Sequence, residues 1–194
     1  MSRFSGARFM LSAAAAAQFP HDSGAEVAFV GRSNAGKSSA INAITHRQGL
    51  ARTSKTPGRT RLVNFFELAP GKRLVDLPGY GYASAPSEER RTWQALIDAL
   101  RTRASLRGLF VIVDARRGLT AGDQGLLEWA APEQPLHVLL SKSDKLNRSE
   151  ARAALAAAAG ALGPRAGVQL FSSSKGTGVA EAEDVLAGWL AGGG

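Results

Sequence analysis

Residues 31–38 have the sequence "GRSNAGKS" and match the phosphate-binding pattern G-x-x-x-x-G-K-[ST] at every position. Two glycines, Gly31 and Gly36, let the main chain turn tightly enough for successive N–H groups to face phosphate oxygens. Lys37 adds a positive charge at the β and γ oxygens, and Ser38 offers a hydroxyl to Mg²⁺. An apolar run precedes the pattern and a helical stretch follows it, which is the required context. The sequence therefore predicts a nucleotide phosphate site.

A second pattern, "DLPG", begins at Asp76, about 40 residues further along and after another apolar run. At this place in P-loop enzymes the aspartate holds Mg²⁺ through water, and the N–H of the glycine, Gly79, faces the γ-phosphate. In Ras-type GTPases a glutamine follows the glycine and orients the attacking water. The chain has Tyr80 instead, which carries no amide. We therefore expect slow hydrolysis alone, with a partner's group or a cation beside the phosphates replacing the glutamine.

The segment "SKSD", residues 141–144, follows the apolar run "LHVLL" and bears on the choice of base. Asp144 can accept two hydrogen bonds from guanine, whereas adenine lacks both donors and would leave the carboxylate unpaired. Lys142 can lay its aliphatic stem along the base. In isolation four polar residues after a strand favour an ordinary turn, but after the two phosphate motifs they predict a guanine site. Ser141 replaces the usual asparagine, which predicts modest affinity.

Two further segments complete the predicted site. In "FSSSKGTG", residues 171–178, the N–H groups of Ser172 and Ser173 are candidates to meet the guanine O6. In "ARTSKTPGRTR", residues 51–61, a threonine is expected to bind Mg²⁺ and the γ-phosphate in a loop ordered by the triphosphate. The candidates are Thr53, Thr56 and Thr60. The same loop carries Arg52, Lys55, Arg59 and Arg61, so it is either a basic contact surface or a solvated loop, or both.

The order of apolar runs and helical stretches predicts the elements that position these motifs. A mostly parallel sheet covered by helices on both faces is expected, since strands and helices alternate. Only "APG" joins the second and third runs, which predicts an antiparallel hairpin. We therefore predict the Ras-like P-loop GTPase fold, with six strands, one of them antiparallel, and about five helices. The predicted strands are 26–30, 61–68, 72–77, 109–115, 136–141 and 168–173.

Helical periodicity and caps mark some of the helices. Apolar residues recur at Trp93, Leu96, Ile97 and Leu100, one face of a helix, and again at Val185, Leu186, Trp189 and Leu190. Asn147 with Glu150 forms a capping-box pattern at the start of another helix. Two alanine-rich tracts, 13–17 and 156–159, are expected to favour helix.

Composition limits the class of protein. The chain has 194 residues, 44% of them hydrophobic, and no cysteine, which fits one globular α/β domain without disulfides. The net charge is +8, and residues 1–60 carry eight Lys/Arg against Asp22 and Glu26. Such a balance favours an anionic partner, although a solvated basic face is the plainer explanation. Residues 1–22 are expected to be a structured leader on a domain formed by 23–194, rather than a signal peptide. No run approaches the roughly 20 apolar residues of a membrane span.

At the level of whole motifs the sequence resembles the EngB (YihA/YsxC) family of bacterial ribosome-biogenesis GTP-binding proteins, of the TRAFAC class of P-loop GTPases. The resemblance covers nearly the whole chain. It rests on "EVAFVGRSNAGKSSAINAIT", "ARTSKTPGRTRLVNFFEL", "DLPGYGYA", "VIVDARRGLT" and "SKSDKL", in this order and spacing. "DLPGYGYA" together with "TPGRT" is specific to this family, whereas the phosphate loop alone is not.

The resemblance implies a set of site residues. It selects Thr60 and Ser38 as the Mg²⁺ ligands, with Asp76 acting through water, and Lys37, Asn34, Thr60 and Gly79 as the catalytic group. Some glutamine-lacking GTPases that resemble this chain have an asparagine at the position of Asn34 that helps to hold K⁺; the alternative is that Asn34 merely suits a tight turn. The implied GTP-binding residues are Gly31, Arg32, Ser33, Asn34, Ala35, Gly36, Lys37, Ser38, Gly58, Arg59, Thr60, Arg61, Leu62, Asp76, Leu77, Pro78, Gly79, Ser141, Lys142, Ser143, Asp144, Phe171, Ser172 and Ser173.

The resemblance also implies a cellular role. We expect a cytoplasmic, monomeric GTPase that uses Mg²⁺ and acts in assembly of the large ribosomal subunit, with a link to cell division and septation. Contact with rRNA would then use the basic surface of the domain itself. The alternative is a regulatory module in which GTP/GDP exchange controls a division protein and hydrolysis is incidental.

Overall fold

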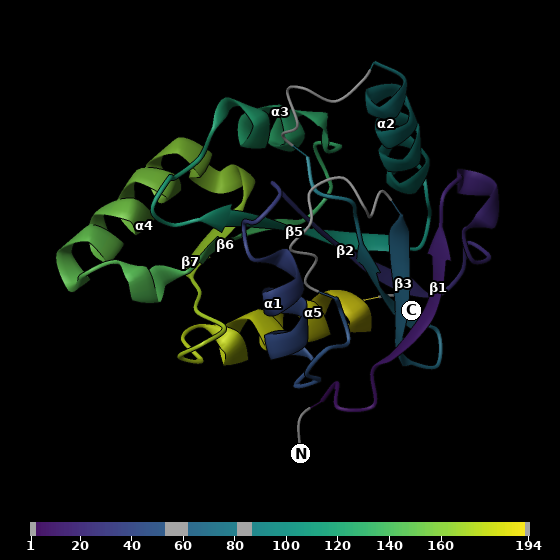
Figure 1. Cartoon of the computed structure of the whole chain (residues 1–194), viewed down its shortest axis with the longest axis horizontal. Helices are drawn as coiled ribbons and strands as arrows, with labels where there is room; N and C mark the ends of the chain where they lie inside the picture. Colours follow the sequence, from purple (N-terminus) through teal and green to yellow (C-terminus); the bar gives the residue numbers. More distant parts are fainter. Residues whose placement is uncertain (1–2, 53–61, 81–86, 193–194) are drawn as a thin grey trace.

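The computed structural model describes residues 3–52, 62–80 and 87–192. Within them, strands and helices alternate along most of the chain (Figure 1). Three short 3₁₀ turns, at Ala16–Gln18, Ser143–Lys145 and Gly163–Arg165, join longer elements. The longer elements are β1 (Arg8–Ala13), β2 (Ala25–Gly31), α1 (Lys37–Ile44), β3 (Val63–Ala69), β4 (Lys72–Asp76), α2 (Ser87–Arg101), β5 (Leu106–Asp114), α3 (Ala121–Trp129), β6 (Leu136–Ser141), α4 (Arg148–Leu162), β7 (Gly167–Leu170) and α5 (Val179–Ala191).

The strands form one sheet in the order β1-β3-β4-β2-β5-β6-β7. β3 is antiparallel to both of its neighbours, β1 and β4, and the other pairs are parallel. β3 is therefore the one strand of this sheet that runs in the opposite direction, as predicted. The predicted β3–β4 hairpin is also confirmed, and Gly71 in its turn has a φ of 71°, a value that glycine adopts without strain.

The predicted count of six strands is wrong by one, because residues 8–13 form β1 at the edge of the sheet. The strand lacks a run of buried apolar residues: Phe9 and Met10 are 55% and 45% exposed. Pairing with β3 holds it in place, and a sequence pattern does not reveal such pairing. The alanine tract at 13–17 belongs to the end of β1 and a 3₁₀ turn, whereas the tract at 156–159 lies in α4 as expected. Of the first tract only Ala13 pairs with β3, and its other alanines form a bend and the start of a 3₁₀ turn despite their helix propensity.

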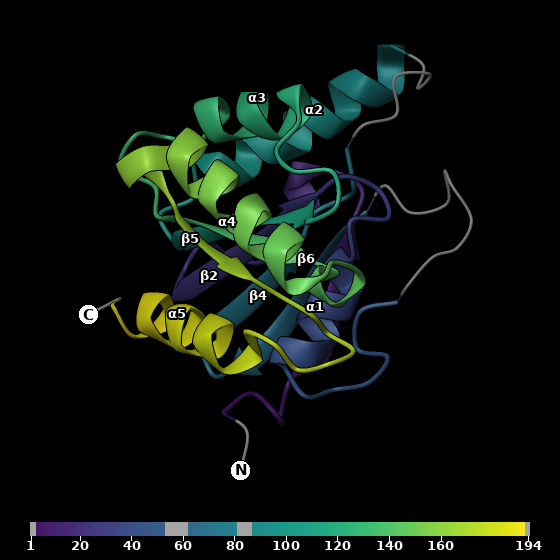
Figure 2. The ribbon, with the colours of Figure 1, turned by 90° about the vertical axis from the view of Figure 1, so that its left-hand side faces the viewer.

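Helices cover both faces of the sheet (Figures 1 and 2). Alternate residues of the central strands point to opposite faces, so Ala28 and Val30 pack toward α2, α3 and α4, while Val27 and Phe29 pack toward α1 and α5. The predicted apolar face of α2 is confirmed, since Leu96, Ile97 and Leu100 are buried. The capping box of α4 is confirmed as well: Asn147 Oδ1 accepts from the N–H of Glu150 at 3.0 Å, and Glu150 Oε2 accepts from the N–H of Asn147 at 2.8 Å.

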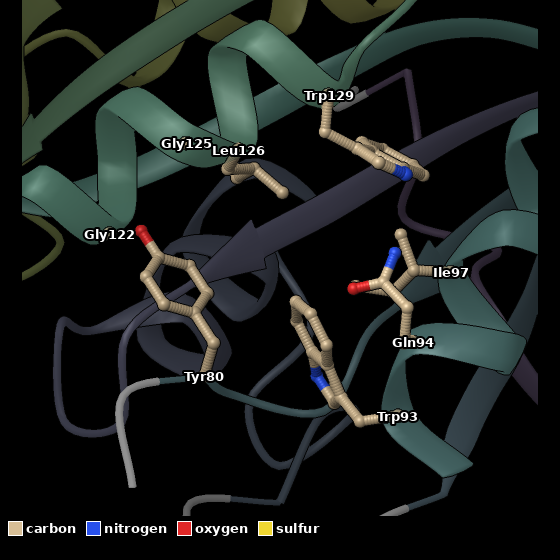
Figure 3. A pocket seen from close by; sticks show the side chains of 8 residues that line it. All are labelled: Tyr80, Trp93, Gln94, Ile97, Gly122, Gly125, Leu126 and Trp129. Atoms are coloured by element: carbon tan, nitrogen blue, oxygen red, sulfur yellow. The ribbon is translucent and has the colours of Figure 1, made fainter. Parts of the chain in front are cut away.

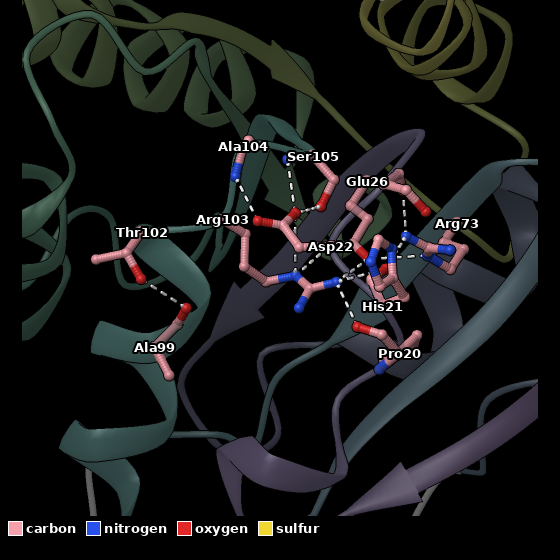
Figure 4. A network of polar contacts seen from close by, with 11 residues as sticks. Pro20, His21, Asp22, Glu26, Arg73, Ala99, Thr102, Arg103, Ala104 and Ser105 are labelled. Carbon is pink, nitrogen blue, oxygen red and sulfur yellow. Dashed lines mark hydrogen bonds and ion pairs between the residues drawn. The ribbon is translucent and has the colours of Figure 1, made fainter.

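A polar network ties the segment before β2 to the rest of the domain (Figure 4). The fully buried carboxylate of Glu26 accepts from Arg73 Nε at 2.8 Å and from Arg103 Nε at 2.7 Å. Two cations and several hydrogen bonds compensate its burial, as a buried charge requires. Asp22 accepts from Ser105 Oγ at 2.6 Å and from the Ser105 N–H at 3.0 Å. Mainly through the Ser105 hydroxyl, these bonds lower the pKa of Asp22 from 3.8 to about 2.

We predict that Asp22→Asn destabilises the fold by about 1 kcal/mol at pH 7, a value reduced to allow for the partial exposure of the carboxylate. A carboxylate whose pKa is lowered by folding stabilises the protein above its unfolded pKa, and this contribution is lost as the pH falls toward the folded value. The difference between variant and wild type should therefore shrink to roughly half at pH 3. Urea unfolding at both pH values measures it. Asp184→Asn, which alters an exposed carboxylate, is the control. A difference that does not change with pH would contradict the prediction.

Candidate functional site

The predicted motifs meet at one edge of the sheet, because β2, β4, β5 and β6 are parallel and the motifs lie at their carboxyl ends. In open α/β sheets ligands bind at this edge. The phosphate loop, residues 31–38, joins β2 to α1. Its Gly36 has a φ of 100°, and a Cβ at Gly31 would lie 2.7 Å from the Ile112 carbonyl oxygen, so both positions require glycine. α1 begins at Lys37 with its N-terminal N–H groups beside the loop, an arrangement suited to anions.

Lys37 and Asp76 contact each other directly. The Lys37 ammonium donates to Asp76 Oδ1, and the two side chains are only 12% and 9% exposed. The structure thus brings together the predicted phosphate-binding lysine and the predicted magnesium aspartate. Ser38 Oγ donates to the Arg52 carbonyl at 3.2 Å, which places the start of the 51–61 segment beside the predicted magnesium serine. The other predicted residues of that segment, Thr53, Lys55, Thr56, Gly58, Arg59, Thr60 and Arg61, lie outside the described residues, whereas Leu62 is half-buried just before β3.

The "DLPG" segment lies against the phosphate loop. Leu77 is buried and donates its N–H to the Phe29 carbonyl at 3.0 Å. The Tyr80 N–H donates to the Gly31 carbonyl at 3.3 Å, and the Ser33 N–H donates to the Tyr80 carbonyl at 3.1 Å. A Cβ at Gly79 would lie 3.1 Å from the Ser33 nitrogen. Gly79 is therefore close to the loop that is predicted to hold the phosphates.

The "SKSD" segment also contacts the phosphate loop. Ser141 Oγ donates to the carbonyl of Ala35, and Lys142 Nζ donates to the Asn34 carbonyl at 2.5 Å. Lys142 has a φ of 57°, a left-handed conformation that turns the chain sharply after β6. Ser141 thus fixes the predicted base-binding segment on the loop even though it is shorter than asparagine. Ser143 does not face the loop; its hydroxyl donates to the Phe171 carbonyl at 3.0 Å.

Asp144, the predicted guanine-binding carboxylate, is held by a neighbouring hydroxyl. Its Oδ1 accepts from Ser172 Oγ at 2.6 Å, and this bond is the main reason that the pKa of Asp144 is lowered. The carboxylate therefore remains an acceptor at neutral pH. The N–H of Ser172 donates to the Thr177 carbonyl at 2.9 Å and so is not directed toward a base. The N–H of Ser173 stays a prediction.

Asp114 is a polar residue of this site that the sequence analysis did not select. It ends β5 directly opposite Ser141 in the β5–β6 register. Its carboxylate accepts from Lys142 Nζ at 3.0 Å and from Arg116 Nη2 at 2.7 Å, and Arg116 holds the pKa of this carboxyl well below its usual range. Lys142 is thus oriented by Asp114 and by the Asn34 carbonyl together. No sequence motif marks this role, because only the pairing of β5 with β6 brings Asp114 beside Lys142.

Comparisons with known proteins identify the family. Residues 26–142 match the family model described as "50S ribosome-binding GTPase". A "Probable GTP-binding protein EngB" of Azoarcus sp. (strain BH72) is 54% identical over 98% of this chain and 94% of that protein. The protein of the same description from Coxiella burnetii (strain RSA 331 / Henzerling II) is 50% identical over 95% of this chain and 92% of that protein. The chain belongs to the EngB family of GTP-binding proteins.

Solved structures agree with the EngB assignment at the level of the fold. The crystal structure of a probable GTP-binding protein EngB aligns with a TM-score of 0.66 and 22% identity, covering 86% of this chain and 99% of that one. A complex of Era with MgGDPNP and part of 16S ribosomal RNA aligns with a TM-score of 0.61 and 19% identity over 86% of this chain and 57% of that one. The predicted Ras-like P-loop fold is confirmed.

Among the described residues, no helix is long and apolar enough to cross a membrane.

Proposed function

We propose that this EngB-family chain is a GTP-dependent switch in assembly of the large ribosomal subunit, required for normal cell division and septation. The proposal that the chain binds GTP rests on the direct contact between residues 141–144 and the phosphate loop, through Ser141 Oγ and Lys142 Nζ. This contact supports the proposal because it brings Asp144, the predicted guanine acceptor, to the same site as the N–H groups predicted to bind phosphate. The ribosomal part is supported by the description of the matching family and by the net charge of +8.

The residues at the loop fit Mg²⁺, because Ser38 and Asp76 supply the oxygen donors that this ion prefers. Ser38 and Thr60 would bind the ion directly and Asp76 would bind it through water. Bound Mg²⁺ neutralises charge on the β- and γ-phosphates. Lys37, which is paired with Asp76, would turn its ammonium to the same phosphate oxygens. The N–H of Gly79 would donate to the γ-phosphate, and the Lys142 stem would cover the guanine while Asp144 accepts from its N1–H and N2–H₂.

Hydrolysis by the isolated chain is proposed to be slow, because no amide follows Gly79. The Tyr80 hydroxyl donates to the Asp123 carboxylate of α3 instead of facing the phosphate loop. A partner or a cation would then complete the site in the cell. We also propose that the chain works in the cytoplasm as a monomer, with residues 23–194 as the GTPase domain and residues 1–22 as a leader packed on it.

Cosedimentation with purified large ribosomal subunits tests this function. The protein bound to a non-hydrolysable GTP analogue should pellet with the subunits, and the protein bound to GDP should remain mostly in the supernatant. Copurification of rRNA with the recombinant protein would add support. Tight GTP and GDP binding without any nucleotide-dependent association with ribosomal particles would overturn the ribosomal role. It would favour a regulatory GTP/GDP-binding module for a division protein.

The basic 51–61 segment leads to a quantitative prediction for this assay. Reversing Arg52, Lys55 and Arg59 to glutamate should weaken binding to the subunits and reduce its salt dependence, by about 0.7–0.9 units of slope for each rRNA phosphate that the variant no longer neutralises. Affinity for GTP is measured alongside, because the segment is also predicted to contact nucleotide. Reversing Arg148 and Arg152, which are exposed on α4, is the control and should leave the slope unchanged. If the salt dependence of binding is the same in the triple variant and the wild type, the segment is only a solvated loop.

A further inference from the structure

The side chain of Tyr80 lies among side chains of α2 and α3 (Figure 3), and its hydroxyl donates to Asp123 of α3. A cavity of about 230 Å³ lies there, lined mainly by apolar side chains that include Trp93, Leu126 and Trp129. The Tyr80 and Trp93 rings meet edge to face, with their centroids 6.2 Å apart. At Gly122 an added Cβ would lie 3.3 Å from Tyr80 Cε2, so this glycine of α3 leaves room for the ring. The tyrosine is therefore packed in a defined orientation.

Asp123 fixes the far end of the tyrosine. It is 1% exposed and accepts the Tyr80 hydroxyl on Oδ1. Its Oδ2 accepts from the Thr120 N–H at 2.7 Å and from Thr120 Oγ1 at 2.6 Å, the capping box that begins α3. Burial, and secondly the bond to Asp123, raise the pKa of Tyr80 well above its usual range, so the phenol stays protonated as a donor. The tyrosine is thus attached to the capped start of α3.

The residue on the other side of Gly79 is held as well. Trp93 Nε1 on α2 donates to the Pro78 carbonyl at 2.9 Å. Pro78 is therefore anchored to α2 and Tyr80 to α3, while the main chain of Tyr80 pairs with Gly31 and Ser33 of the phosphate loop. Gly79 lies between these two anchors. Its N–H is the group predicted to recognise the γ-phosphate, and its position is fixed by contacts that involve no nucleotide.

We propose that Tyr80 is a positioning residue that, through Asp123, holds the Gly79 N–H in place for the γ-phosphate. The inference rests on the proposed GTP switch. Fixing a main-chain segment costs conformational entropy, and the Tyr80–Asp123 bond meets part of that cost before GTP binds. GDP has no γ-phosphate and gains nothing from an ordered Gly79. The residue that replaces the glutamine thus acts on the recognition of triphosphate and does not orient water.

The test compares the affinities of Tyr80→Phe and the wild type for a fluorescent GDP and a fluorescent non-hydrolysable GTP analogue. Phenylalanine keeps the ring in the cavity and removes only the hydroxyl. Loss of one hydrogen bond to a buried carboxylate should lower the affinity for the GTP analogue about five- to tenfold, while the affinity for GDP should change by less than about twofold. A double-mutant cycle with Asp123→Ala gives the second readout: in that background Tyr80→Phe should have no further effect on either nucleotide.

Thr120→Ala is the matched control. It removes a side chain from the same capping box but leaves the bond between Tyr80 and Asp123, so it should lower stability without changing the ratio of GTP to GDP affinity. If Tyr80→Phe weakens both nucleotides equally, or if Thr120→Ala reproduces the selective loss, the inference is wrong. A wild-type protein that binds neither guanine nucleotide would instead overturn the proposed function, so the two failures are distinguishable.

Discussion

Asp144→Asn is expected to lower the affinity for GTP by about a hundredfold and to create affinity for xanthosine triphosphate. The carboxylate is predicted to accept two hydrogen bonds from guanine, and an amide cannot accept both. Xanthine has a carbonyl at C2 where guanine has an amine, so the amide of the variant can donate to it. The exchange of one acceptor for one donor at this position therefore reverses the preference for the base.

The surroundings of Asp144 make this substitution a clean test. Ser172 Oγ donates to Oδ1 of the carboxylate at 2.6 Å, and the amide oxygen of asparagine can accept the same bond. The variant should therefore fold normally. Calorimetric titrations with GTP, XTP and ATP measure the effect, and Asp184→Asn, which changes an exposed carboxylate of α5 that pairs with Arg3, is the control. A preference for GTP that Asp144→Asn leaves unchanged would show that residues 141–144 do not select the base.

The sequence predicted the parts of this site that lie in short contiguous motifs. The phosphate loop, "DLPG" and "SKSD" each carry their chemistry within four to eight residues, and the alternation of strands and helices fixes the edge at which they meet. β1 was missed because its outward residues, Phe9 and Met10, are apolar and exposed, so neither alternation nor a buried run marks the strand. Its place comes from pairing with β3, whose paired residues lie 50 to 59 positions further along the chain.

The other features that the sequence did not predict depend on contacts between residues that are far apart in the chain. The Tyr80 side chain packs against α3. The bounds of this helix were not predicted from the sequence, although Thr120 and Asp123 form its capping box. Asp114 was likewise missed as the partner of Lys142, because the contact joins the ends of two strands that only the sheet register brings together. Local motifs thus predict the groups that would contact a ligand, whereas the groups that orient them are found only in the folded chain.

The absence of a glutamine after Gly79 leads to the second large effect that we expect. With the Tyr80 hydroxyl bound to Asp123, a candidate among the described residues of the phosphate loop is Asn34. This residue is exposed on the phosphate loop, with a φ of 64° and its carbonyl bound to Lys142 Nζ. If the side-chain oxygen of Asn34 helps to hold a monovalent cation there, the cation would neutralise charge that develops between the β- and γ-phosphates, as an arginine finger does.

Single-turnover GTP hydrolysis is therefore expected to be at least about tenfold faster in K⁺ than in Na⁺, a small part of what an arginine finger contributes. Two variants distinguish a role of Asn34 in binding the cation from a role in forming the tight turn. Asn34→Gly adopts a positive φ without strain, so it should keep nucleotide affinity and lose the acceleration by K⁺. Asn34→Ala should lose the acceleration too, with added strain in the loop. If Asn34→Gly responds to K⁺ like the wild type, the asparagine serves only the tight turn. Equal wild-type rates in the two salts would leave the ribosome to replace the glutamine, because binding to a large subunit can supply a group that the isolated chain does not contain.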